Sequence, residues 1–132
     1  MTDVDAVHDR LRQLLAPYRD SLVATKDGPG GLSLAIPGLE DKPWGYVVGT
    51  RVGKRYVSYY LMPVYALPQL RAAMSAGLAK RMQGKACFNF TSIDEVLLDE
   101  LADLTRRGIE AYRALAPFGR PDGKGAIAQR SR

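Results

Sequence analysis

The sequence predicts an α+β fold in which helices cover one face of an antiparallel sheet of about five strands. The stretch 44–65 contains two runs rich in Val and Tyr that flank Gly53-Lys54, a pattern typical of a β-hairpin. Apolar residues recur at helical spacing near both ends of the chain and again between residues 70 and 82. Hairpin-linked strands combined with such helices indicate the element order α-β-β-β-β-α-β-α.

The first part of the chain supplies one helix and two strands. Residues 3–16 carry apolar side chains at helical spacing, and the helix is expected to end before Pro17. The expected strands are residues 21–26 and 32–36, because the glycine-rich stretch between them suits a tight turn.

The register of the hairpin follows from its turn. A two-residue turn at Gly53-Lys54 places Val52 opposite Arg55. One face then carries the cross-strand pairs Thr50/Val57, Val48/Tyr59 and Tyr46/Leu61. The other, more polar face carries the pairs Arg51/Tyr56, Gly49/Ser58 and Val47/Tyr60. We therefore expect the first face to belong to the core.

The second half of the chain supplies a helix, a strand and the longest helix. Pro68 suits the first turn of a helix, and Gly77 is expected to divide that helix in two. Residues 85–90 are the expected last strand. The capping-box sequence Ser92-Ile-Asp-Glu95 is expected to open the final helix.

The net charge of +5 is unevenly distributed. The range 42–93 contains eight basic residues and no acidic residue, and five acidic residues follow between 94 and 103. The stretch 117–132 holds four basic residues and one acidic residue without apolar periodicity, so we expect a disordered tail after a single domain at 1–116. The basic middle suggests an anionic partner, and the alternative interpretation is a solvated surface balanced by the acidic helix.

Three segments of the chain carry a family resemblance. They read VGKRYVSYYLMPVY (52–65), KRMQGKACFNF (80–90) and ELADLTRRGIEAYR (100–113). In these motifs the chain resembles the YdhG-like family of small bacterial domains, over roughly residues 3–115. The resemblance implies a frataxin-like fold. It also implies a link to iron, since some relatives are described as iron chaperones, and it implies no catalytic residues.

The polar face of the hairpin is the first candidate site. Its residues are Arg51, Tyr56, Ser58 and Tyr60. If the last strand joins the sheet with its phenylalanines in the core, this face also gains Lys85, Cys87 and Asn89. Donors beside aromatic rings suit a small anionic ligand or a partner protein, and they also suit a plainly solvated face.

Cys87 has two interpretations. An ammonium group at Lys85, on the same face, would lower the pKa of the thiol and raise its reactivity. A buried free cysteine would instead behave as a small, inert hydrophobic residue. The sequence leaves both open.

The acidic start of the last helix is the second candidate site. Iron accepts carboxylate oxygens, and the residues that could form such a ridge are Asp94, Glu95, Asp99 and Asp103. A solvated helix face with favourable N-terminal charge explains the same pattern. Iron is the cofactor expected under this alternative, and otherwise none is expected. His8, the single histidine, is expected on the surface or flank of the first helix.

A nucleic-acid interface is the third possibility. The basic middle and tail would supply the charge, but no recognised motif is present and the domain carries little net charge, so nucleic acid is not favoured. No apolar run reaches the ~18 residues that span a membrane, and a single cysteine fits the reducing cytoplasm. The favoured function is non-enzymatic binding of a small anionic ligand or a protein partner.

Overall fold

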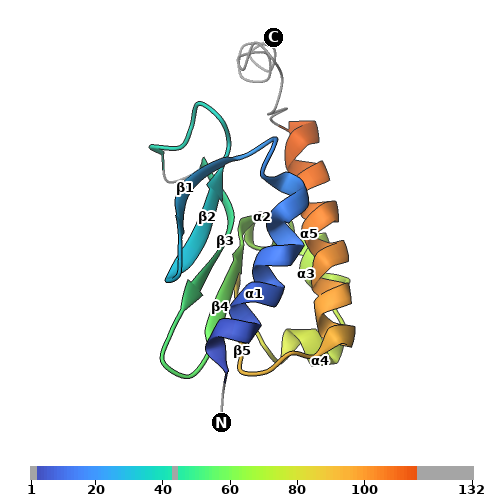
Figure 1. Cartoon of the computed structure of the whole chain (residues 1–132). Coiled ribbons are helices and arrows are strands. Elements are labelled where there is room, and N and C mark those ends of the chain that lie inside the picture. Colours follow the sequence, from blue (N-terminus) through green and yellow to red (C-terminus); the bar gives the residue numbers. More distant parts are fainter. Residues whose placement is uncertain (1–2, 43–44, 116–132) are drawn as a thin grey trace.

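Five strands form one antiparallel sheet, and the helices lie against one of its faces (Figure 1). The computed structural model describes residues 3–42 and 45–115, so the predicted tail at 117–132 lies outside the described residues. Each strand pairs with the next strand along the chain. The predicted α+β class, with a five-stranded antiparallel sheet, is confirmed.

The strands are β1 (Val23–Gly28), β2 (Gly31–Ala35), β3 (Tyr46–Val52), β4 (Val57–Leu61) and β5 (Cys87–Phe90). The helices are α1 (Val4–Leu15), the 3₁₀ turn η1 (Ala16–Tyr18), α2 (Met62–Ala66), α3 (Pro68–Ala72), α4 (Ala76–Ala79) and α5 (Glu95–Leu115). None of the helices described here is long and apolar enough to cross a bilayer.

Three short helices lie between β4 and β5, where the sequence predicts a helix divided in two at Gly77. Leu67 has an extended backbone, with φ −121° and ψ 96°, because the residue before a proline is disfavoured in the helical region. Pro68 then occupies the first turn of α3. Ser75 begins α4 by accepting a hydrogen bond from the backbone N–H of Leu78 at 3.1 Å.

The register of β3 and β4 differs from the prediction by two residues. Val52 pairs with Val57 and Thr50 with Tyr59, so the turn spans residues 53–56. The backbone N–H of Gly53 donates to the carbonyl of Tyr56 at 2.8 Å and closes this longer turn. Side chains alternate with a period of two, so a shift of two residues leaves them on the predicted faces.

Tyr46 and Val47 are the exceptions to the predicted faces. On β2, Leu34 pairs with Val48 and Ala35 pairs with Tyr46, which leaves Val47 as an extra residue in a β-bulge. The bulge brings Val47 into the core, where it is fully buried. Tyr46 instead packs edge-on against Tyr60, with 6.5 Å between ring centroids.

The core lies between the sheet and the helices. The largest fully buried side chains are Tyr59, Phe88, Phe90, Leu11, Leu15, Leu32, Leu34, Leu61, Leu78, Leu98, Leu101 and Ile109. Burying one such side chain contributes ~1.5–3 kcal/mol. The hydroxyl of Tyr59 lies 2.6 Å from that of Thr105 on α5, so the polar end of this buried ring is satisfied.

The N-cap of α5 is Asp94, and the predicted capping box at Ser92 is wrong. The helix begins at Glu95, and the carboxylate of Asp94 accepts a hydrogen bond from the backbone N–H of Leu97 at 3.3 Å. Asp94 directly precedes the helix and reaches the third helical N–H, as an N-cap residue does. Ser92 lies two residues too early for this role.

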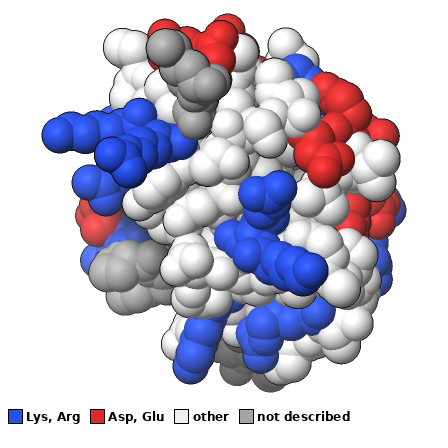
Figure 2. Space-filling view, turned by 90° about the horizontal axis from the view of Figure 1, so that it is seen from below, with Lys and Arg blue, Asp and Glu red and all other residues white. Residues whose placement is uncertain are grey.

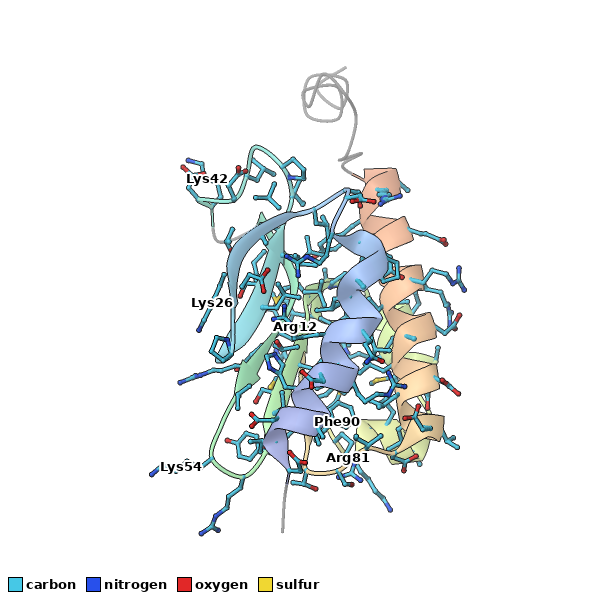
Figure 3. All side chains as sticks on the ribbon, in the orientation of Figure 1. Arg12, Lys26, Lys42, Lys54, Arg81 and Phe90 are labelled. Carbon is cyan, nitrogen blue, oxygen red and sulfur yellow. The ribbon has the colours of Figure 1, made fainter. Side chains whose placement is uncertain are left out.

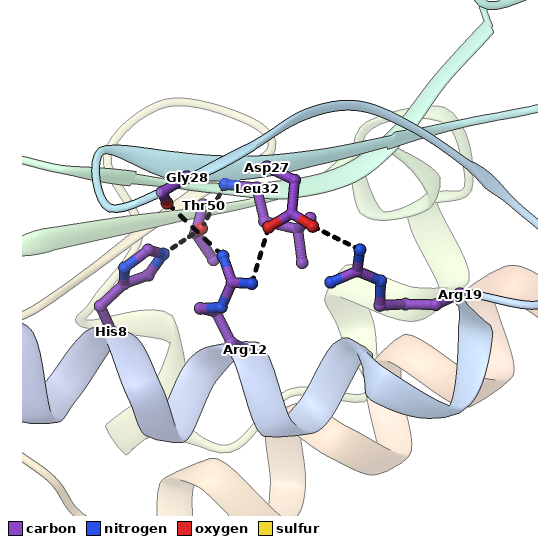
Figure 4. Close-up of polar contacts among 7 residues, drawn as sticks. All are labelled: His8, Arg12, Arg19, Asp27, Gly28, Leu32 and Thr50. Carbon is purple, nitrogen blue, oxygen red and sulfur yellow. Dashed lines mark hydrogen bonds and ion pairs between the residues drawn. The ribbon is translucent and has the colours of Figure 1, made fainter.

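His8 is buried beneath the sheet, which corrects the predicted surface position. It is 4% exposed, and its Nε2 lies 2.7 Å from the hydroxyl oxygen of Thr50 (Figure 4). The same oxygen accepts the backbone N–H of Leu32 at 3.0 Å. The imidazole of His8 thus links α1 to the hydroxyl of Thr50 on β3, and the same hydroxyl is hydrogen-bonded to β2. Helical spacing alone missed this because the partner lies 42 residues away.

The burial of His8 makes stability depend on pH. Desolvation is the largest cause that lowers the pKa of His8 below 6.5, followed by the charge of Arg12, while Asp9 and Asp5 oppose the shift. Below pH 6.5 the unfolded chain therefore takes up a proton that the folded chain resists.

We expect the free energy of unfolding to fall as the pH is lowered from about 7 to about 5, with a slope of at most ~1.4 kcal/mol per pH unit for one proton. Urea titrations at several pH values measure this slope. His8→Gln, which cannot titrate, should remove it. Equal slopes in both proteins would show that His8 does not resist protonation. The carboxylates of Asp27 and Glu95 have lowered pKa values because of their arginine partners, so their contributions are lost only at more acidic pH.

Candidate functional site

The predicted ligand-binding residues gather on the face of the sheet that the helices leave open. Arg51 pairs with Ser58 and Ser58 with Asn89, so these three residues form a row across β3, β4 and β5. Tyr60 pairs with Cys87 in the next row. The two rows lie two residues apart along β4, a distance of ~7 Å at the usual rise per residue of a strand, so one small ligand can contact residues of both rows. The expectation that the last strand joins this sheet is confirmed.

Asn89 connects the two rows through its amide oxygen. The hydroxyl of Ser58 donates to this oxygen at 2.7 Å, and the thiol of Cys87 lies 3.6 Å from it. Both contacts use the oxygen, and within the described residues the amide nitrogen of Asn89 makes no hydrogen bond. Two N–H donors are therefore available on the open face.

A shallow pocket of about 210 Å³ lies at one end of this face. Its lining residues are Arg51, Val52, Gly53, Tyr56, Ser58 and Tyr60. The volume is below the ~300 Å³ at which pockets for drug-sized ligands begin, so the pocket suits a smaller molecule. Arg51 is exposed and forms no ion pair with any described residue. A free guanidinium group can bind a carboxylate or phosphate through two parallel hydrogen bonds.

Tyr46 and Gly49 shape this face, where alternation along the strand predicted Gly49 but not Tyr46. A Cβ on Gly49 would lie 2.4 Å from the hydroxyl oxygen of Tyr46 and 2.5 Å from the carbonyl oxygen of Leu32. Gly49 thus leaves space for the Tyr46 ring, which packs against Tyr60. Burial raises the pKa of Tyr46, so its hydroxyl stays protonated at neutral pH. A glycine inside a strand pattern was the signal available in the sequence.

Lys85 lies beside the site and contacts a different residue. Its Nζ is 5.7 Å from the ring centroid of Tyr65, which suits a cation–π contact worth ~0.5–1 kcal/mol at an exposed site. Strand alternation placed Lys85 on the face of Cys87, but β5 begins only at Cys87. The structure therefore brings together Arg51, Tyr56, Ser58, Tyr60, Cys87 and Asn89, and it engages Lys85 with α2.

Three of the four candidate iron ligands at the start of α5 have partners among the described residues. Asp94 caps the helix, Glu95 pairs with Arg10, and Asp103 pairs with Arg106. The hydrogen bond from Arg10 lowers the pKa of Glu95. In the described part of the chain, no three His, Cys, Asp or Glu side chains converge as a metal site would require. Iron binding by Asp94, Glu95, Asp99 and Asp103 stays a prediction.

No family model, curated protein or solved structure matches the chain. The resemblance to the YdhG-like family stays a prediction from the three motifs.

The close approach at Gly49 can be tested by adding one methyl group. Gly49→Ala should lower the free energy of unfolding by ~1–3 kcal/mol, because the new Cβ meets a backbone carbonyl that cannot move without disturbing the sheet. Gly30→Ala is the matched control, since a Cβ there meets nothing within 4 Å. Denaturant titrations measure both. Equal losses would show that Tyr46 does not lie across Gly49.

Proposed function

We propose that this chain is a non-enzymatic binding domain that holds a small anionic ligand on the open face of the sheet. The observation that carries the proposal is the exposed guanidinium group of Arg51, which lacks a carboxylate partner among the described residues and borders a pocket with two tyrosines. Because the charge of Arg51 is not neutralised by a described carboxylate, it is available to bind an anionic ligand.

The chemistry around Arg51 favours a planar anion. The guanidinium group can hold two oxygens of a carboxylate or phosphate, while Tyr56 and Tyr60 offer ring surface beside it. Asn89, one strand beyond Ser58, adds N–H donors. A small aryl carboxylate or aryl phosphate uses all three features.

The position of the histidine supports binding without catalysis. His8 is the single histidine of the chain, and it is hydrogen-bonded to Thr50 on the covered side of the sheet. The imidazole therefore cannot serve as a general base for a ligand on the open face, because a base must come within hydrogen-bond reach of its proton.

Benzoate and phenyl phosphate are suitable probes, with benzyl alcohol as the neutral control. In amide NMR titrations, we expect both anions to shift resonances of β3, β4 and β5 around Arg51, and the alcohol to shift them much less. Arg51→Ala should weaken binding at least tenfold, since a charge-assisted hydrogen bond contributes ~1.5–3 kcal/mol. The affinity of Arg51→Lys should lie between the affinities of the unsubstituted protein and of Arg51→Ala.

Arg107→Ala is the matched control, because it removes the same charge from an exposed position on α5. It should leave the affinity unchanged, and thermal melting should confirm that all variants are folded. Shifts that cluster away from the pocket, or equal weakening by Arg107→Ala, would contradict the proposed site.

A further inference from the structure

Five arginines on the helical side of the molecule pair with carboxylates. Arg10 pairs with Glu95, and Arg12 and Arg19 both pair with Asp27 (Figure 4). On α5, Arg106 and Arg107 pair with Asp103. These contacts neutralise much of the positive charge on that side.

The basic residues around the β3–β4 turn lack such partners. Arg51, Lys54 and Arg55 are all exposed, and none forms an ion pair with a described residue. The range 42–93 contains no acidic residue that could supply one locally. We call Arg51, Lys54, Arg55 and Tyr56 the turn cluster.

Further basic residues lie at the same end of the molecule. Figure 3 places Lys54 and Arg81 at its lower end, far from Lys42. The backbone N–H of Asn89 donates to the carbonyl of Arg81 at 2.8 Å, so the backbone of Arg81 continues the row that begins at Arg51. Figure 2 views this end directly: Lys and Arg atoms gather over its left, central and lower parts, and most acidic atoms lie toward the upper and right edges.

The net charge of the domain is small, but positive charge is in excess around the β3–β4 turn. Acidic and basic residues nearly cancel in the sum over residues 1–116, but in space they cancel mainly on the helical side. An uncompensated cluster attracts an anionic polymer even when the whole domain is nearly neutral. The small net charge of the domain is therefore not an argument against a nucleic-acid partner.

An aromatic ring within the cluster distinguishes the kind of polymer. Tyr56 directly follows Arg55 and is 42% exposed, and Tyr60 lies on the same face. Bases of single-stranded nucleic acid stack on such rings while neighbouring cations hold the phosphates. An acidic polypeptide offers carboxylates to the cations but no comparable planar surface to the ring.

We propose that the turn cluster binds single-stranded nucleic acid, with Arg51, Lys54 and Arg55 on the phosphates and Tyr56 against a base. The inference does not require the pocket to bind a free anion, because Lys54 and Arg55 lie outside its lining.

The test is fluorescence anisotropy with labelled dT12 and rU12 on the full chain at several salt concentrations. Each phosphate contact on a single strand adds ~0.7 to the slope of log affinity against log salt, so Lys54→Ala with Arg55→Ala should reduce that slope by about 1.4. Arg106→Ala with Arg107→Ala removes the same charge from α5 and should leave it unchanged. Tyr56→Leu should weaken binding at least about fivefold without changing the slope, and Tyr56→Phe should restore it.

Each contrary result has a definite meaning. An unchanged slope in the turn variant, or equal reductions in both double variants, would overturn the inference. Competition by poly-glutamate as strong as by unlabelled dT12 would also overturn it, in favour of an acidic protein partner. Oligonucleotide binding in a chain that fails to bind benzoate would sustain the inference and remove the proposed function, and the reverse result would remove the inference alone.

Discussion

Helices cover only one face of the sheet, and this constraint assigns a role to nearly every residue of β3 and β4. Successive side chains of a strand point to opposite faces. Val48 and Leu61 therefore lie in the core, whereas Arg51 and Tyr60 reach the open face. Most residues on the open face of these strands can vary in chemistry without disturbing the packing beneath the helices. Gly49 is the exception, because a Cβ there would meet the backbone carbonyl of Leu32.

Polar contacts on the face that the helices cover hold the sheet in place, and this also holds the open face in place. The hydroxyl of Thr50 contacts His8 of α1, and the hydroxyl of Tyr59 contacts Thr105 of α5. A buried hydroxyl without a partner costs ~1–3 kcal/mol, so these pairs favour one placement of each helix. Most of the candidate ligand residues also lie on paired strands, which hold side chains more accurately than loops do.

Most residues of the candidate site could be predicted from the sequence, but their arrangement in space could not. Alternation alone placed Arg51, Ser58 and Tyr60 together, because their face survives a register shift of two residues. Tyr46 could not be placed in this way, because the bulge at Val47 arises from pairing with β2 and leaves no mark in the local pattern. For Lys85, alternation along β5 gives no placement, because the strand begins only at Cys87.

Local patterns in the sequence are enough to predict the α+β class, the five strands and the core face of the central hairpin, since hydrophobic periodicity and turn residues are local properties. The tertiary structure alone decided the four-residue turn at 53–56, the burial of His8 and the distribution of ion pairs. The burial of His8 and the ion pairs depend on residues far apart in the chain, such as His8 and Thr50 or Arg10 and Glu95. Composition counts charges along the chain, but only folding determines which charges neutralise one another.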